Sequence, residues 1–213
     1  MNDIAAIRKD YKLQSLDEKD VFKDPIKQFE KWWNEVLGST IEEVNAMTLA
    51  TATPDGKPSA RIVLLKGFTN EGFIFFTNYE SHKGEELKEN PQACLVFFWK
   101  ELERQVRIEG LIEKISEAES DEYFNSRPAG SKIGAWASPQ SKVIGSREIL
   151  EEKVKAIEKQ FTNTAIERPE HWGGYILKPL LIEFWQGRPS RLHDRIQYTK
   201  LENKNWKIER LAP

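Results

Sequence analysis

The stretch "MTLATATPDGKPSARIVLLKGF", residues 47–68, decides the fold class. It consists of two strand-like runs on either side of a Pro-Asp-Gly sequence, which is typical of a hairpin turn. The preceding stretch, residues 23–39, has the signals of a helix, in which Asp24 caps, Pro25 takes the first position and Gly38 ends the helix. The change of period at Met47 therefore predicts that an antiparallel sheet begins there.

Strand-like runs continue along the chain, at residues 72–78, 92–100, 104–116, 173–187, 191–201 and 206–211. Helices are predicted at residues 81–91, 116–128 and 146–160, the second with the capping-box spacing of Ser116 and Glu119. Strands dominate the middle and the end, so the pattern predicts an α+β fold with an antiparallel sheet, of a kind that can close as a barrel. Residues 1–20 are polar and aperiodic, and we expect a mobile arm followed by a single domain, residues 21–213.

The composition excludes some classes of protein. The chain has 213 residues, 39% of them hydrophobic, and a formal net charge of -2. That charge argues against a protein that binds nucleic acid through a basic excess. Cys94 has no partner cysteine and lies in an apolar run, so a reducing compartment fits. Without an apolar signal region or a run long enough for a membrane helix, the sequence predicts a cytoplasmic protein that binds no membrane.

A cationic stretch follows the strand predicted near the C-terminus, in "IEFWQGRPSRLHDR" (residues 182–195). If its end is extended, Arg191, His193 and Arg195 share one face, about 6.8 Å apart in succession. Such a face suits a planar anionic ligand, because arginine stacks on flat rings and binds phosphate. The alternative is a solvated edge strand whose charges are paired by Glu183 or Asp194.

Two further cationic pairs have strand and helix spacing. Arg61 and Lys66 are five apart, so on a regular strand they point to opposite faces and serve different partners unless a bulge intervenes. His82 and Lys83 follow a helix cap at Ser81, where the helix dipole disfavours cations unless an anion binds there. Strand-end surface charges remain the alternative for the first pair.

A fourth cluster lies at "EYFNSRPAGSK" (residues 122–132). Tyr123 and Arg127 have the spacing of one helical face, Pro128 ends the helix, and Ser131 in the following loop offers a hydroxyl. The alternative is an aromatic–cation pair on the surface. No metal-ligand spacing, nucleophile elbow or dinucleotide fingerprint is present in the sequence. The sequence thus has several cationic clusters suited to binding phosphate and no recognisable residues for hydrolysis. This combination indicates a phosphorylated cofactor that carries out the chemistry while the protein positions it.

The stretch "IEFWQGRPSRLHDR" closely resembles the signature of the pyridoxine (pyridoxamine) 5′-phosphate oxidases, FMN enzymes of vitamin B6 metabolism. "RIVLLKG", "FFTNYESHKGEEL", "RQVRIEG", "SRPAGSKIGAWAS", "PQS" and "ERLAP" recur in that family in the same order. The resemblance implies a split β-barrel of six to eight strands with peripheral helices. It also implies a homodimer with both active sites at the subunit interface.

The resemblance assigns roles residue by residue. The FMN-binding residues that it implies are Arg61, Ile62, Val63, Leu64, Leu65, Lys66, Phe76, Thr77, His82, Lys83, Gln105, Gln140, Ser141, Trp185 and Arg195. The substrate-binding residues that it implies are Arg8, Tyr11, Lys66, Tyr123, Arg127, Ser131, Arg191 and His193. Arg191 and His193 are the catalytic pair, and Arg8 and Tyr11 belong to an arm that closes over the vitamer. His82 departs from the arginine of many members, so flavin affinity is expected to be weaker or more pH-dependent.

The implied reaction is oxidation of pyridoxine 5′-phosphate or pyridoxamine 5′-phosphate to pyridoxal 5′-phosphate, with hydride transfer to FMN and O2 as the final acceptor, giving H2O2. Two other functions are compatible with the same binding residues. One is a flavin- or vitamer-binding protein without turnover, and the other is a flavin reductase that uses a nicotinamide donor. The Arg-x-His pair favours the oxidase.

Overall fold

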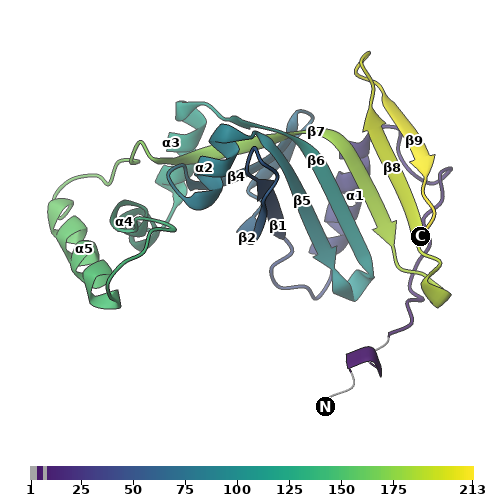
Figure 1. The fold of residues 1–213 in the computed structure, drawn as a ribbon, viewed down its shortest axis with the longest axis horizontal. Helices are drawn as coiled ribbons and strands as arrows, with labels where there is room; N and C mark the ends of the chain where they lie inside the picture. The colour runs from purple at the N-terminus through teal and green to yellow at the C-terminus, as the bar shows by residue number, and fades with distance from the viewer. Residues whose placement is uncertain (1–3, 7–8) are drawn as a thin grey trace.

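The computed structural model describes residues 4–6 and 9–213, which form one curled antiparallel sheet with helices around it (Figure 1). The strands are β1 (Ala46–Ala52), β2 (Pro58–Leu64), β3 (Gly67–Thr69), β4 (Gly72–Asn78), β5 (Gln92–Trp99), β6 (Arg104–Lys114), β7 (Trp172–Gln186), β8 (Asp194–Lys200) and β9 (Trp206–Arg210). The α-helices are α1 (Pro25–Leu37), α2 (His82–Glu89), α3 (Glu117–Ser126), α4 (Ala129–Ala137) and α5 (Arg147–Gln160). Three short 3-10 turns cover Ile4–Ala6, Lys100–Leu102 and Pro189–Arg191. The predicted α+β class and antiparallel sheet are confirmed, and the sheet has nine strands.

The hairpin predicted from residues 47–68 is confirmed. β1 pairs with β2 from Ala46↔Leu64 to Ala52↔Pro58. The turn is closed by the amide of Thr53, which donates to the carbonyl of Lys57 at 3.0 Å. Gly56 in this turn has φ +84°, a conformation that glycine adopts without steric cost.

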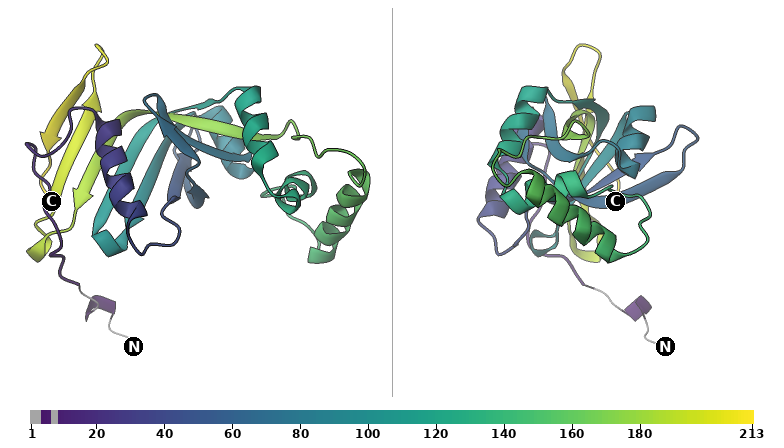
Figure 2. Two further views of the ribbon diagram at one scale, coloured as in Figure 1. Left: turned by 180° about the vertical axis from the view of Figure 1, so that it is seen from behind. Right: turned by 90° about the vertical axis from the view of Figure 1, so that its left-hand side faces the viewer.

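Strand β7 is the centre of the sheet because it pairs with three other strands. One edge pairs with β6 from Tyr175 to Gln186. The other edge pairs with β4 through residues 172–177 and with β8 through residues 181–186. The change of partner falls at residues 178–180, where Pro179 has no N–H to donate, and the register with β6 shifts between Glu109 and Gly110. This irregularity lets the sheet curl, as Figure 2 shows.

Helix α1 lies against the buried face of the sheet (Figure 2). Its predicted boundaries are confirmed, with Asp24 accepting from the amide of Ile26 at 2.8 Å. Phe29 is fully buried, and Trp32 packs edge-on to Phe184 with ring centroids 5.2 Å apart. Leu37, the last residue of the helix, is 57% exposed. The helix buries Trp32 because the aromatic side chains of the sheet lie on that side.

Helices α4 and α5 stand apart from the sheet, beyond α3 (Figure 1). The capping box at the start of α3 is confirmed. Ser131, which the sequence placed in a loop, lies in the first turn of α4. Its amide donates to the carbonyl of Pro128 at 2.9 Å. Two glycines weaken the helical signal of this segment, which is why it reads as a loop. Within residues 4–6 and 9–213, no helix is long and apolar enough to cross a membrane.

The N-terminal segment runs beside β8 and β9 (Figure 1). The amide of Leu16 donates to Oδ2 of Asp194 at 3.0 Å, and Leu16 is buried. Arg210 of β9 donates to both carboxylate oxygens of Glu18 at 2.6 Å. These contacts hold the segment against β8 and β9. That residues 1–20 form a mobile arm, distinct from a domain at residues 21–213, stays a prediction. Arg8, expected to close over a substrate, lies outside the described residues.

Candidate functional site

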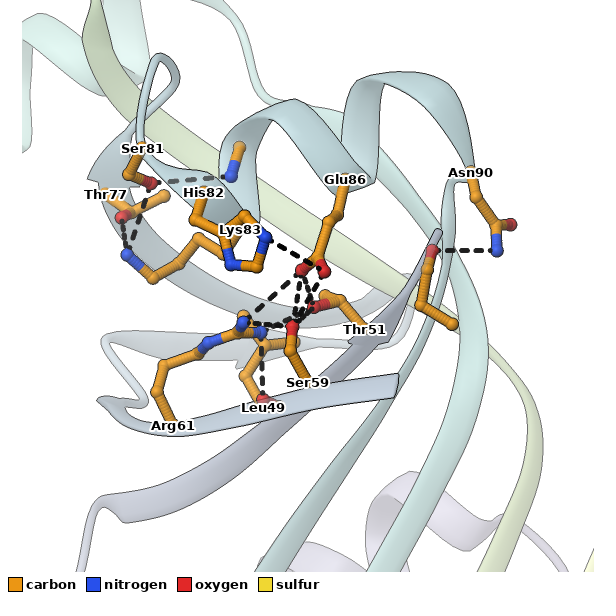
Figure 3. A network of polar contacts seen from close by, with 12 residues as sticks. Leu49, Thr51, Ser59, Arg61, Thr77, Ser81, His82, Lys83, Glu86 and Asn90 are labelled. Atoms are coloured by element: carbon orange, nitrogen blue, oxygen red, sulfur yellow. Dashed lines mark hydrogen bonds and ion pairs between the residues drawn. The ribbon is translucent and has the colours of Figure 1, made fainter. Parts of the chain in front are cut away.

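The first cluster of candidate residues surrounds the start of helix α2 and is called the α2 site; it comprises Arg61, Thr77, Lys83, Glu86 and Gln140. Lys83 folds back from the first turn toward β4 (Figure 3). Its Nζ lies 3.2 Å from Oγ1 of Thr77 and 3.0 Å from Oε1 of Gln140. The predicted position of the cation at the helix start is therefore confirmed, and strands and loops far apart in sequence supply its neighbours.

Arg61 enters the α2 site from β2 (Figure 3). Its Nη1 donates to Oγ1 of Thr51 at 2.5 Å, and its Nη2 lies 3.3 Å from Oε2 of Glu86. Glu86 is nearly fully buried, and although burial opposes ionisation, hydrogen bonds from Ser59 and Thr51 lower the pKa of its carboxyl. His82 contributes through Nε2, 3.5 Å from Oε1 of Glu86.

The α2 site is short of negative charge. Burial, followed by the repulsion of Arg61, lowers the pKa of Lys83 to about 8. One carboxylate, Glu86, faces these two cations and is already hydrogen bonded to hydroxyl groups. A cation held at a helix N-terminus with a depressed pKa is stabilised by an anion, and phosphate is the anion that such positions commonly bind.

The second cluster, called the Tyr123 site, is a stack of aromatic rings capped by cations; it comprises Lys66, Phe76, Tyr123, Arg127 and Trp172. The rings of Phe76 and Tyr123 are stacked with centroids 3.9 Å apart, and those of Phe76 and Trp172 lie 5.5 Å apart. The guanidinium carbon of Arg127 lies 4.4 Å from the centre of the Trp172 ring. Nζ of Lys66 lies 5.9 Å from the Tyr123 ring centre.

Arg127 has a buried donor that its neighbours in the described part of the chain leave unsatisfied. It caps the end of α3 in an extended conformation, because the residue before Pro128 avoids the helical region. Its Nη1 is buried and has no hydrogen-bond partner among the described residues. Burial also lowers the pKa of its guanidinium. An unsatisfied buried donor of this kind costs on the order of 1–3 kcal/mol, which an anionic ligand would offset.

The third cluster, called the Trp185 site, lies where β7 ends. The imidazole of His193 packs on Trp185 with ring centroids 4.6 Å apart, and Tyr11 stands edge-on to Trp185 at 5.8 Å. Gln105 of β6 and Arg195 of β8 are the cross-strand partners of Trp185. A cavity of about 550 Å³ opens beside these rings, and it is lined by Lys9, Asp10, Tyr11, Arg188, Ser190, Arg191 and His193.

His193 has a defined hydrogen-bonding role. Its Nδ1 lies 3.1 Å from the amide nitrogen of Arg188, which can only donate. Burial and then the neighbouring charge of Arg191 lower the pKa of His193, while Asp194 raises it. The imidazole is therefore neutral near pH 7 and presents its Nε2–H as a donor.

Arg191 and Arg195 differ from the expectation of one extended cationic face. β8 begins at Asp194, and Arg191 lies before it in a 3-10 turn with φ +62°. Arg195 is on the strand, but its Nε donates to Oε1 of the buried Glu183 at 2.7 Å. The ion pair with Glu183 that the alternative interpretation named is thus present, and Arg191 points from a turn instead of from the strand.

The three sites form two groups along β7. The α2 site and the Tyr123 site are neighbours, because Thr77 and Phe76 are adjacent in β4. The Trp185 site lies thirteen residues beyond Trp172 on β7, about 43 Å away at the rise of an extended strand. A single chain therefore does not bring all the predicted residues together.

The structure also fixes the remaining predicted residues. The residues of the "RIVLLK" run that follow Arg61 are Ile62, Val63, Leu64, Leu65 and Lys66, of which Ile62 is 65% exposed and Leu65 is buried. Ser141 is exposed, with φ +69°. Sequence reasoning missed Glu86 and Trp172. The spacing of His82 and Glu86 at i and i+4 was a signal for the former, whereas Trp172 reaches the site through strand pairing and left no local signal.

Two family models match the chain. Residues 34–161 match a model described as "Pyridoxamine 5'-phosphate oxidase". Residues 172–213 match one described as "Pyridoxine 5'-phosphate oxidase C-terminal dimerisation region", which supports homodimer formation. The second match begins at the first residue of β7.

Relatives cover the whole chain. A protein of Trichormus variabilis named pyridoxine/pyridoxamine 5'-phosphate oxidase is 58% identical over 210 residues, covering 99% of this chain and 98% of the relative. One of the same name from Polynucleobacter asymbioticus is 58% identical over 213 residues, with full coverage of both. The solved structure of PhzG from Burkholderia lata 383, in complex with tetrahydrophenazine-1-carboxylic acid, has a TM-score of 0.88 and 31% identity over 94% of this chain and 99% of that one.

We expect the pKa of His193 to lie below the ordinary histidine value and to rise in an Arg191→Ala variant, because removing a nearby positive charge favours the imidazolium. An NMR titration of the ring protons, with the signal assigned through His193→Asn, measures it. Arg147→Ala, on the exposed face of α5, is the matched control and should leave the pKa of His193 unchanged. A pKa that is insensitive to Arg191→Ala contradicts this account of the site.

Proposed function

The chain belongs to the pyridoxamine 5′-phosphate oxidase family, and on that premise we propose that it oxidises pyridoxine 5′-phosphate and pyridoxamine 5′-phosphate to pyridoxal 5′-phosphate with FMN as cofactor. One observation carries the proposal. Two phosphate-suited sites flank a single strand, with Thr77 in the α2 site and Phe76 in the Tyr123 site. Adjacent sites of this kind suit two phosphorylated ring compounds bound next to each other.

The α2 site fits the phosphate of FMN. Arg61 and Lys83 supply two cations against one buried carboxylate, and Thr77 and Gln140 are within hydrogen-bonding distance of the lysine. Burial and the neighbouring charge of Arg61 lower the pKa of Lys83, so an anion beside it would favour its charged form. We propose that the backbone of residues 62–66 runs along the flavin.

The Tyr123 site fits the phosphate of the vitamer. The orphaned Nη1 of Arg127 is the donor that such a group would satisfy. Lys66 lies over Tyr123 on the same side of β4 as Phe76. Arg61 and Lys66 are five positions apart in the sequence and lie in different sites. In this proposal Arg61 binds the phosphate of FMN and Lys66 binds the phosphate of the vitamer.

We propose that a second copy of the chain completes each active site with its Trp185 site. The distance of about 43 Å along β7 prevents one chain from joining both groups. The match of residues 172–213 to a dimerisation region supports this arrangement. In the assembled site, Gln105, Trp185 and Arg195 would contact the flavin, while Arg191 and His193 would contact the pyridine ring.

FMN, when bound, supplies the hydride acceptor for the C4′ carbon of the vitamer and the route by which O2 is reduced to H2O2. The residues of the chain hold and orient the reactants, which accounts for most of the catalysis in such a reaction. Arg191 offsets charge on the pyridine ring as the reaction proceeds. His193, neutral with its Nε2–H free to donate, hydrogen bonds to a ring substituent.

Anaerobic addition of pyridoxine 5′-phosphate to the FMN-loaded protein tests the function. We expect loss of the flavin absorbance without any nicotinamide, and oxygen consumption once air is admitted. Arg191→Ala should slow the single-turnover reduction, because the ring loses its cationic neighbour. A binding protein would keep its colour, and a reductase would lose it only with NAD(P)H. Either result contradicts the proposal.

Replacing Arg127 by alanine should weaken binding of the phosphorylated vitamer by about 1.5–3 kcal/mol, the value of a hydrogen bond to a charged group. The dissociation constant is measured by titration of the FMN-loaded protein. Pyridoxine, which lacks the phosphate, should bind the variant and the parent protein equally. Arg147→Ala is the control for a general loss of positive charge. Undiminished affinity for pyridoxine 5′-phosphate contradicts the assignment of the Tyr123 site.

The affinity for FMN should fall as the pH rises from 7 to 9. Above pH 8 Lys83 loses its proton in the free protein, so a charged hydrogen bond to the phosphate is lost, up to about a tenfold effect. Fluorescence titration with FMN and with riboflavin separates the phosphate from the ring, since riboflavin should show a flat profile. Lys83→Met should bind FMN more weakly and without this pH dependence. Parallel profiles for the two flavins would show that Lys83 does not contact the phosphate.

A further inference from the structure

Glu103, at the start of β6, anchors the N-terminal segment to the sheet. It follows the 3-10 turn Lys100–Leu102 in a left-handed conformation, φ 55°, and is 3% exposed. Its Oε2 accepts hydrogen bonds from the amides of Lys12 at 2.8 Å and Leu13 at 3.1 Å. A buried carboxylate that receives two backbone donors is a strong, charge-assisted contact.

The same residue also holds the end of β7. The amide of Gly187 donates to the carbonyl oxygen of Glu103 at 2.7 Å. Tyr11 packs directly on Gly187, where a Cβ atom would lie 2.7 Å from Cγ and 2.8 Å from Cβ of the tyrosine. Those atoms are close to the tyrosine backbone, so a larger residue would displace the segment and not merely rotate a ring. Glu103 and Gly187 thus fix Tyr11 from two sides.

The anchored segment contacts His193 and Ser190, the residue that precedes Arg191. The ring of Tyr11 lies 6.0 Å from the imidazole of His193. Oδ1 of Asp10 accepts from the amide of Ser190 at 3.3 Å. Ser190 and Arg191 both have positive φ, 57° and 62°, which side-chain-bearing residues rarely adopt and which surrounding contacts must stabilise.

We propose that Glu103 is a positioning residue: by binding the backbone of residues 12 and 13, it places Tyr11 beside His193 and Asp10 under the turn that carries Arg191. This inference rests on the proposed function. Glu103 acts through the N-terminal segment, since its contacts are with that segment and with residues 186 and 187. Its loss should therefore weaken the hold on the vitamer while the α2 site stays intact.

Release of the segment is measured by trypsin cleavage of the FMN-loaded protein after Lys9 and Lys12, read by mass spectrometry. Glu103→Ala should speed this cleavage about tenfold or more, the factor expected for loss of a charged hydrogen bond. Glu103→Gln keeps an acceptor oxygen and should give an intermediate rate. Glu101→Gln, two residues earlier and exposed, is the matched control and should cleave like the parent protein. Circular dichroism confirms that each variant is folded.

The kinetic test separates positioning from a structural role. Glu103→Ala and Gly187→Ala should both raise KM for pyridoxine 5′-phosphate, whereas the FMN dissociation constant stays within about twofold. In a Tyr11→Ala background, Glu103→Ala should add less than it does in the parent protein, because part of its effect acts through the placement of Tyr11. Additive effects on kcat/KM, or a Glu103→Ala protein whose segment resists trypsin as the parent does, would overturn the proposal.

Failure of the anchor and failure of the proposed function give different results. Unchanged cleavage in Glu103→Ala together with normal oxidation of the vitamer contradicts the anchor alone. Faster cleavage in a protein that oxidises neither vitamer supports the anchor and contradicts the function. The cleavage assay needs no turnover, so it reports on the contact between Glu103 and the segment in either case.

Discussion

The pairing of β7 with three strands is the interaction on which the rest of the structure depends. β6 pairs with one edge from Tyr175 to Gln186, and the other edge changes from β4 to β8 around Pro179. Because hydrogen bonding in the sheet fixes register, this pairing places Trp172 in one site and Trp185 in another. It also buries Glu183, which then binds Arg195. The sheet thus positions the two tryptophans and the ion pair of Glu183 with Arg195.

Charge is distributed so that a few cations lack ordinary partners. The chain has a formal net charge of -2, and Arg195 and Arg210 are bonded to carboxylates. Lys83 and Arg127 are the opposite case, since burial lowers the pKa of both groups. Both stand in the neighbourhood of β4, with an anion-deficient site on either side. An anionic ligand would remove an electrostatic cost that the folded chain otherwise carries, which links binding to stability.

Local signals predicted local structure well. The hairpin of residues 47–68, the caps of α1 and the capping box of α3 depend on a few consecutive residues, and all are confirmed. Errors arose where distant residues decide the outcome. Ser131 was placed in a loop, but it lies in α4 despite its glycine-rich surroundings.

The candidate site was predictable as a list of residues but not as a geometry. Alternation along a strand placed Arg61 and Lys66 toward different partners, and the structure puts them in different sites. No local pattern showed that Arg191 lies in a left-handed turn outside β8, since that turn is supported by Asp10, about 180 residues away in sequence. Glu103 left no signal either, because its role depends on contacts with residues 12 and 13.

The division of the site along β7 has a consequence for how an active centre is assembled. Each half is organised by its own end of the strand: α2 and α3 surround the first half, while β6, β8 and the N-terminal segment surround the second. Within the second half, Gly187 contacts both Glu103 and Tyr11, so the N-terminal segment and the end of β7 are stabilised together. Under the proposed function, the rings of the two ligands would be enclosed where the two halves meet. Docking of two copies through the C-terminal strands would then bring together surfaces that are already ordered. The residues of such a site would lose little conformational entropy when the ligands bind. A shared site on a rigid strand has this advantage over one on a flexible loop, which must be ordered on binding.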